Sequence, residues 1–199
     1  MAKNTQPVAK KCKALGISPA TMGYFTKDTN RNPGSQTRKK KSEYATQLNE
    51  KQKVKFVYGI LEKQFHGYYE KASQMPGKTG DNLLILCERR LDNVVYRIGY
   101  ASTRREARQL VNHGHITVNG RKVNIPSYQV KPEMIIALKE SSRDIEKIKA
   151  NIEDSASRPV PKWIEYDKAN NIAKIVAMPA RDDVDLPIEE HLIVELYSK

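Results

Sequence analysis

The sequence predicts an α+β protein: a helical domain, a smaller module of helices with a mostly antiparallel sheet, and a basic extended N-terminal arm. Three observations support this. Apolar side chains recur at helical spacing through residues 43–75 and 81–98. Residues 102–123 place a short helix before a hairpin. The first 41 residues hold few apolar side chains and several clusters of cations.

The formal charge of +12 is unevenly spread along the 199 residues. Residues 1–60 carry +10, residues 61–150 carry +6 and residues 151–199 carry −4. A polyanion should therefore meet the N-terminal and middle parts, while the acidic tail should face solvent or another protein. Cys12 and Cys87 are too few for a disulfide framework or a metal site. Because no apolar run is long enough to cross a membrane, the cytosol is the simplest location.

Residues 1–41 are interpreted as an arm that becomes ordered only on a partner, because they have too few apolar residues for a core. The alternative is a solubilising tail. In the helical part, Gly59 is expected to separate two helices within 43–75. A further helix is expected over 81–98, with Gly99 at its end and a buried stripe. The stripe residues are Leu84, Cys87, Leu91, Val94, Val95 and Ile98.

The stretch 102–123 begins with Thr103 and Glu106, three residues apart, which is the pattern of a capping box. In a helix of 3.6 residues per turn, Ala107, Leu110 and Val111 fall on one side. The opposite side is predicted to be polar and exposed; its residues are Arg104, Arg105, Arg108 and Asn112. The bland alternative is a solvated basic helix on an ordinary domain.

A hairpin should follow this helix, because Gly114 is a natural stop and Asn119-Gly120 is a strong two-residue turn signal. Beyond it, residues 134–138 read as a buried strand and residues 144–152 as a short helix. Residues 163–178 read as a second hairpin. The chain should end in an amphipathic helix over 189–197.

Together with residues 90–97, the 102–123 stretch closely resembles an RNA-binding module. The module occurs in small-subunit ribosomal protein S4, in some pseudouridine synthases and in some tyrosyl-tRNA synthetases, so the flanks must decide. From about residue 42 to the end, the chain resembles the bacterial S4 family of small-subunit ribosomal proteins. The matching segments, in order, are 42–44, 50–53, 58–59, 62–65, 90–96, 109–120, 126–128 and 191–199.

The resemblance implies a helical domain over 42–90, completed by a returning segment 179–199, with the RNA-binding module inserted as residues 91–178. It also implies direct and early binding to small-subunit (16S) ribosomal RNA and nucleation of subunit-body assembly. It implies a place where messenger RNA enters, beside ribosomal proteins three and five of the small subunit. The contact with protein five would influence translational accuracy. No cofactor is implied.

The N-terminus departs from the family pattern. Many members hold zinc there with four cysteines, whereas this chain keeps only Cys12, and one thiolate cannot complete a tetrahedral site. We therefore expect no metal, and the chain could be a second, zinc-independent copy. The Pro33-Gly34 turn lacks the histidine that the family carries after it.

The candidate contacts divide by charge. The candidate RNA-binding residues are Lys10, Lys11, Lys13, Arg38, Lys39, Lys40, Lys41, Lys51, Lys53, Lys55, Arg89, Arg90, Arg97, Arg104, Arg105, Arg108, Asn112, His113, His115, Arg121 and Lys122. The candidate protein contacts are Asp182, Asp183 and Asp185.

Two other classes of protein also use an RNA-binding module of this kind. An RNA-modifying enzyme would need a separate catalytic domain, and no Ser/His/Asp, Cys/His or paired-carboxylate constellation stands out. His113 and His115 fit contacts to backbone or phosphate better than acid–base work. A free RNA chaperone or ribosome-rescue factor would share the module without the matching flanks.

Overall fold

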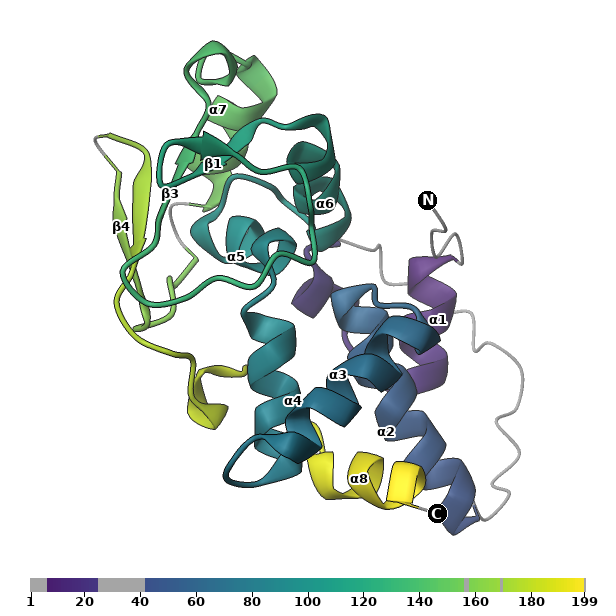
Figure 1. The fold of residues 1–199 in the computed structure, drawn as a ribbon. Helices are drawn as coiled ribbons and strands as arrows, with labels where there is room; N and C mark the ends of the chain where they lie inside the picture. The colour runs from purple at the N-terminus through teal and green to yellow at the C-terminus, as the bar shows by residue number, and fades with distance from the viewer. Residues whose placement is uncertain (1–6, 25–41, 156–157, 169, 199) are drawn as a thin grey trace.

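The computed structural model describes residues 7–24, 42–155, 158–168 and 170–198. Buried apolar side chains form two separate clusters. The first core is built by helices from both ends of the chain. The second lies in the middle of the chain, in a module of helices against one antiparallel sheet, as predicted (Figure 1).

The N-terminal segment 7–24 is folded, so the prediction of a coreless, extended arm is wrong there. It forms helix α1 (Val8–Leu15) and the 3₁₀ helix η1 (Pro19–Met22). Cys12, Leu15 and Met22 are buried in the first core. Val8, Cys12 and Leu15 are four and three residues apart, so they share one helix face. The neighbouring lysines masked this short apolar pattern. Residues 25–41, and with them Arg38, Lys39, Lys40 and Lys41, lie outside the described residues.

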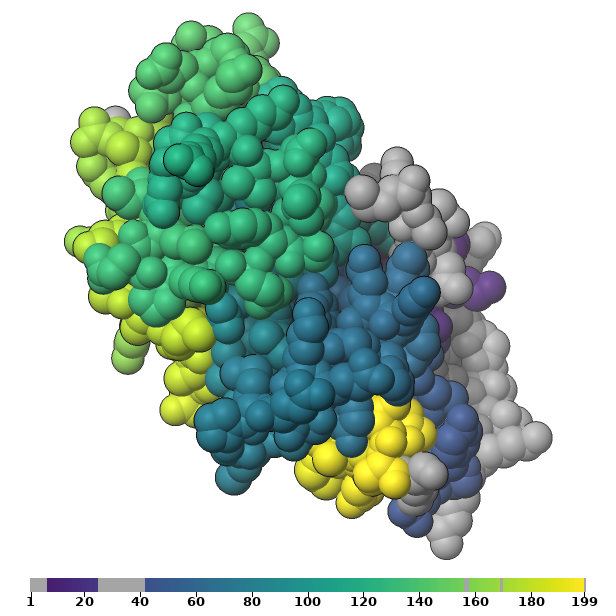
Figure 2. Space-filling model, viewed as in Figure 1, coloured from purple at the N-terminus to yellow at the C-terminus, as the bar shows by residue number. Residues whose placement is uncertain are grey.

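Three further helices and the C-terminal helix complete the first core. They are α2 (Glu43–Tyr58), α3 (Glu62–Gln74), α4 (Thr79–Glu88) and α8 (Glu190–Ser198). Ser42 caps α2 through its hydroxyl oxygen, which accepts from the Ala45 amide at 3.3 Å. Gly59 ends α2 with φ +63°, as its place in the sequence predicted. Helix α8 packs against α2 and α4, and in the space-filling view its yellow surface lies beside the blue surface of α2 (Figure 2).

The single helix expected over 81–98 is two helices, α4 and α5 (Leu91–Ile98). The chain between them pairs with a distant segment instead of continuing the helix. The Leu91 amide donates to the Tyr128 carbonyl and the Val130 amide donates to the Arg89 carbonyl, both at 2.9 Å. The expected stripe is buried throughout, but Leu84 and Cys87 belong to the first core and its later members belong to the second.

The second core lies between α5, α6 (Arg104–His113) and a five-stranded sheet of order β2-β1-β3-β5-β4. Every strand pair is antiparallel. The strands are β1 (Ile116–Val118), β2 (Arg121–Lys122), β3 (Ile135–Leu138), β4 (Ile164–Asp167) and β5 (Ile172–Ile175). The short helices are η2 (Glu140–Ser142), α7 (Glu146–Asp154) and η4 (Arg181–Asp183). Asn119 and Gly120 both have positive φ, 50° and 75°, which confirms the predicted hairpin turn.

Candidate nucleic-acid interface

Helix α6 carries three of the candidate arginines, and its first turn is capped by side chains. The Thr103 hydroxyl oxygen accepts from the Glu106 amide at 3.2 Å, as predicted. The Glu106 carboxylate accepts from the amide and hydroxyl of Ser102, at 2.9 and 2.7 Å. Burial alone would raise the pKa of Glu106, but its bonds to Lys147, Ser102 and Asn151 lower it to about 2. The carboxylate is therefore part of the α6 start.

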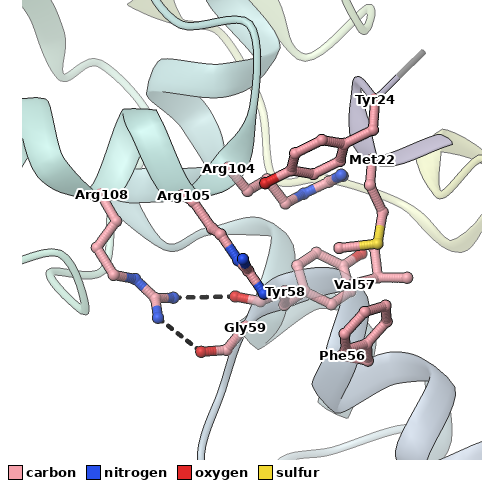
Figure 3. A pocket seen from close by; sticks show the side chains of 9 residues that line it. All are labelled: Met22, Tyr24, Phe56, Val57, Tyr58, Gly59, Arg104, Arg105 and Arg108. Atoms are coloured by element: carbon pink, nitrogen blue, oxygen red, sulfur yellow. Dashed lines mark hydrogen bonds between the residues drawn. The ribbon is translucent and has the colours of Figure 1, made fainter. Parts of the chain in front are cut away.

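Arg108 does not face solvent, so that expectation is wrong. Its Nε donates to the Asp92 carboxylate at 2.8 Å, and its two Nη atoms donate to the carbonyls of Gly59 and Tyr58 at 2.6 and 2.9 Å (Figure 3). Those carbonyls end α2, where the helix dipole favours a cation. Arg108 thus joins α6 to α2 and α5.

Arg104 is also not on an exposed face, since only 8% of its surface is accessible. Its Nε donates to the side-chain oxygen of Asn93 at 2.8 Å. Its guanidinium lies 4.3 Å from the Tyr96 ring centroid and 5.2 Å from that of Tyr58, within cation–π range. The true outer member of this helix face is Arg105, which is exposed.

Arg90 and Arg97 are buried in ion pairs. Arg90 donates to the Asp92 carboxylate at 2.7 and 3.0 Å and to the Tyr68 hydroxyl at 2.8 Å. Arg97 donates to the fully buried Glu88 at 2.9 and 3.2 Å. Burial would raise the pKa of Glu88, yet the adjacent Arg97 holds it below its ordinary value.

These side chains form one polar assembly between the two cores, which we call the joint. Its members are Tyr58, Tyr68, Glu88, Arg90, Asp92, Asn93, Arg97, Arg104 and Arg108. The buried Arg89 lies beside it and donates from Nε to the Val130 carbonyl at 2.9 Å. Each of these five arginines thus donates at least one hydrogen bond to an oxygen of the protein itself. Glu88 and Asp92, two acids that stand close to Arg89, Arg90 and Arg97 in the chain, were the sequence signal for this.

A small cavity of about 30 Å³ lies at the edge of the joint (Figure 3). Met22, Tyr24 and the end of α2 line one side, and the three α6 arginines line the other. The volume suits ordered water and is too small for a nucleotide base. The cavity is therefore a gap where α6 meets the end of α2 and the segment 22–24, and it does not hold a nucleotide.

The lysines of α2 are half-buried and paired with acids. Lys51 and Lys55 both bind Glu62, and Lys53 binds Glu50. Burial would raise the pKa of Glu62, but the two lysines and the Tyr197 hydroxyl lower it to about 2. Part of the predicted cationic surface on α2 is thus already neutralised.

The remaining candidate residues reach the surface. The exposed ones are Lys10, Lys13, Arg105, His113, Arg121 and Lys122, and the half-buried ones are Lys11, Asn112 and His115. His113 and His115 lie at the end of α6, with ring centroids 6.0 Å apart. Leu110, predicted on the apolar side of the helix, is partly buried against the second core.

The acidic tail is partly engaged inside the chain. The Asp185 carboxylate pairs with Arg97, although 74% of its side chain is exposed, and the Asp183 carboxylate accepts from the Ala180 amide at 2.8 Å. Asp182 is exposed. No local pattern in the sequence indicated the Asp185–Arg97 pair, because its two residues are far apart in the chain.

Cys12 is buried, its thiol lies 3.8 Å from the Met22 sulfur, and burial raises its pKa. Among the described residues, no group of three or more His, Cys, Asp or Glu side chains could hold a metal ion. None of the helices in the described ranges is both long and apolar enough to cross a bilayer.

Two family models match the chain. The S4 domain covers residues 89–136, and the ribosomal protein S4/S9 N-terminal domain covers residues 3–88. The first match places the α5–α6–β1 unit in the class of S4-domain RNA-binding modules. The boundary between the two matches falls at the joint.

Similar curated proteins extend over the whole chain. The small ribosomal subunit protein uS4 of Fusobacterium nucleatum is 51% identical over 199 residues, which is all of both chains. The uS4 proteins of Pelotomaculum thermopropionicum and Acetivibrio thermocellus are 58% and 60% identical over 164 residues, 82% of this chain and 79% of theirs. The chain therefore belongs to the uS4 family of small ribosomal subunit proteins.

Proposed function

We propose that the chain binds 16S ribosomal RNA directly and early, and that it nucleates assembly of the small-subunit body. Membership of the uS4 family carries a structural role in the small subunit, rRNA binding and a place in the cytoplasmic ribosome. The observation that carries the proposal is the match of both family models, because the S4 domain alone also fits other RNA-binding proteins. The N-terminal match over 3–88 favours a subunit component over a free chaperone or rescue factor.

The RNA contacts are proposed to come from the side chains that the joint does not use. These are the exposed cations Lys10, Lys13, Arg105, Arg121 and Lys122, with the two histidines at the end of α6. A rigid cationic surface spread over both cores suits a structured RNA, which is bound through shape, phosphate and 2′-hydroxyl contacts. The joint would hold the two parts of this surface in one orientation.

We also propose where individual segments of the chain lie in the small subunit, from their positions in the family. Arg38 to Lys41 would lie where messenger RNA enters, and the acidic segment around Asp182 and Asp183 would contact ribosomal protein five, with protein three nearby. Charge reversal at Asp182 and Asp183 should alter decoding accuracy and leave affinity for naked rRNA nearly intact, because acids repel phosphate. A large loss of rRNA affinity would contradict this.

The decisive experiment is nuclease footprinting of the full chain on naked 16S rRNA. Discrete protection confined to the 5′ domain, without other proteins present, is the expected result. Protection that needs other ribosomal proteins would contradict early, direct binding. Co-sedimentation with dissociated large subunits, rather than with free small subunits, would favour the rescue factor.

The curated relatives are named as ribosomal proteins, not as enzymes, and we propose that this chain has no catalytic role either. A rate assay on uridine-containing RNA should show no turnover. We also propose that it is a zinc-independent copy, since Cys12 packs inside the first core beside Met22.

A further inference from the structure

The end of helix α6 gathers four basic or titratable side chains, which we call the His115 cluster. Its members are His113, His115, Lys122 and Lys139. They come from α6, the start of β1, β2 and the segment after β3. None of the charged groups acting on the His115 ring in the described part of the chain is a carboxylate. The cluster therefore differs from the joint and from the α2 lysines, where acids neutralise the cations.

The backbone brings this cluster together. The Lys139 amide donates to the His115 carbonyl at 2.8 Å, which places the two residues side by side where the paired strands β1 and β3 begin and end. Lys122 lies over the end of α6: a Cβ on Gly114 would stand 2.1 Å from its Cε, and Gly114 also has φ +76°. The positive φ favours glycine at position 114, and the missing side chain leaves room for the end of the Lys122 side chain beside the helix end.

The His115 ring is held in one orientation. Its Nδ1 lies 2.8 Å from the hydroxyl oxygen of Ser142, whose residue is buried at the end of η2. That contact uses Nδ1 alone, so we expect the second ring nitrogen, Nε2, to be available to a ligand. Burial, then the neighbours His113, Lys122 and Lys139, lower the pKa of His115. The free ring accordingly resists a second proton.

We propose that the His115 cluster binds a backbone phosphate of the ribosomal RNA and that His115 takes up a proton as it does so. This rests on the proposed rRNA binding and adds its regulation by pH. A phosphate beside Nε2 would offset the repulsion from the two lysines and accept a hydrogen bond from the protonated ring. Binding would then raise the pKa of His115, so affinity should increase as pH falls.

The sign and size of this effect follow from proton linkage. The gain in rRNA affinity is complete below the pKa that His115 has in the free protein. It is lost as pH rises through the pKa that His115 has in the complex. Between these two values, uptake of one proton steepens the affinity by at most about tenfold per pH unit. At low pH the extra cation should also raise the salt dependence by roughly 0.7–0.9 in log–log slope.

Two substitutions of His115 distinguish its hydrogen bond to Ser142 from its uptake of a proton. His115→Asn keeps an amide near the Nδ1 position, so the Ser142 bond can survive while the outward nitrogen is lost. His115→Gln places a neutral amide near the Nε2 position, so a donor can remain without titrating. The chain's other two histidines, His66 and His191, are exposed on α3 and α8. The double variant His66→Gln/His191→Gln is therefore a matched control.

The test is filter binding of the full chain to 16S rRNA from pH 5.5 to 8.0 at constant salt. Wild type and the double control should gain affinity as pH falls, by up to about tenfold per unit. Both His115 variants should lose this slope, with His115→Gln close to wild type at pH 8. An unchanged slope in both His115 variants would overturn the inference. Failure of wild type to bind at pH 8 would overturn the proposed function itself.

Imidazole NMR with inorganic phosphate identifies the source of the anion. Phosphate alone should raise the pKa of His115 and leave the resonances of His66 and His191 in place. A His115 shift with phosphate, combined with an unchanged RNA slope in His115→Gln, would mean that the cluster takes free phosphate only, and would overturn the proposal. Loss of the slope in His115→Gln, with retained melting temperature, would support it.

Discussion

The joint and the His115 cluster use similar cations for opposite purposes. In the joint, Arg97 and Arg108 are surrounded by Glu88, Asp92 and backbone carbonyls, and the charge is satisfied inside the protein. In the His115 cluster, the charged groups that act on the His115 ring, within the described part of the chain, are His113 and two lysines and include no carboxylate. The number of arginines in a stretch therefore says less about RNA binding than the acids placed near them.

Removing an arginine from the joint should have the largest effect on stability. Arg97→Ala leaves Glu88 buried without its main partner, which should lower the free energy of unfolding by about 3–5 kcal/mol. Urea unfolding measures the loss. The salt dependence of rRNA binding should not change, because Arg97 faces inward. A flatter salt dependence of rRNA affinity with unchanged stability would mean that Arg97 contacts RNA and does not hold the joint together.

The Glu106 carboxylate at the start of α6 should make the stability of the fold depend on pH in the acid range. Because the pKa of Glu106 is lowered to about 2, its contribution is complete above about pH 4.5 and is lost as pH falls towards 2. Wild type should therefore lose up to about 3 kcal/mol over this range. The Glu106→Gln variant should not show this loss of stability at low pH, because its side chain does not titrate. Parallel acid unfolding curves for the two proteins would refute it.

Arg108 gives the sharpest test of the comparison, because the sequence placed it on the outer surface. Arg108→Ala should cost about 1.5–3 kcal/mol, since it removes charged hydrogen bonds to Asp92 and to the end of α2. Arg108→Lys should recover only part, as an ammonium cannot reproduce the planar fork. Melting curves and salt-dependent rRNA affinity decide it. A flattened salt slope without a lowered melting point would restore the original interpretation.

Exposed cations should show the reverse pattern. Arg121→Ala, on β2, should change stability by no more than about 0.5 kcal/mol. It should flatten the log–log salt dependence of rRNA affinity by roughly 0.7–0.9 if Arg121 neutralises one phosphate. Equal effects of Arg121→Ala and Arg97→Ala on both quantities would remove the distinction between surface and joint.

Local signals predicted most elements of the fold. Gly59, Gly114 and Asn119-Gly120 marked real ends and turns because each acts through its own backbone conformation. The break at Arg89-Arg90 could not be read locally, since it depends on pairing with residues 128–130. Cys12 and Leu15 were missed because lysines surround them.

The candidate interface was predicted less well, for an electrostatic reason. Helical spacing alone put Arg104 and Arg108 opposite the apolar face, although both lie against α5 and the end of α2. A sequence shows that a cation exists, but its partner is set by tertiary structure: Asp92 for Arg108, and Asp185 for Arg97, 88 positions away. Lys10, Arg105, Arg121 and Lys122 stay predictions for RNA contact.

The position of α8 has a consequence for the order in which the protein forms during its own synthesis. Every strand and helix of the second core precedes α8 in the chain, so that module can fold while translation continues. The first core cannot close then, because Ile193 is among its fully buried side chains. The parts of α2 and α4 that α8 covers therefore stay exposed until α8 has been synthesised, and a nascent chain halted before Glu190 should need a chaperone to stay soluble.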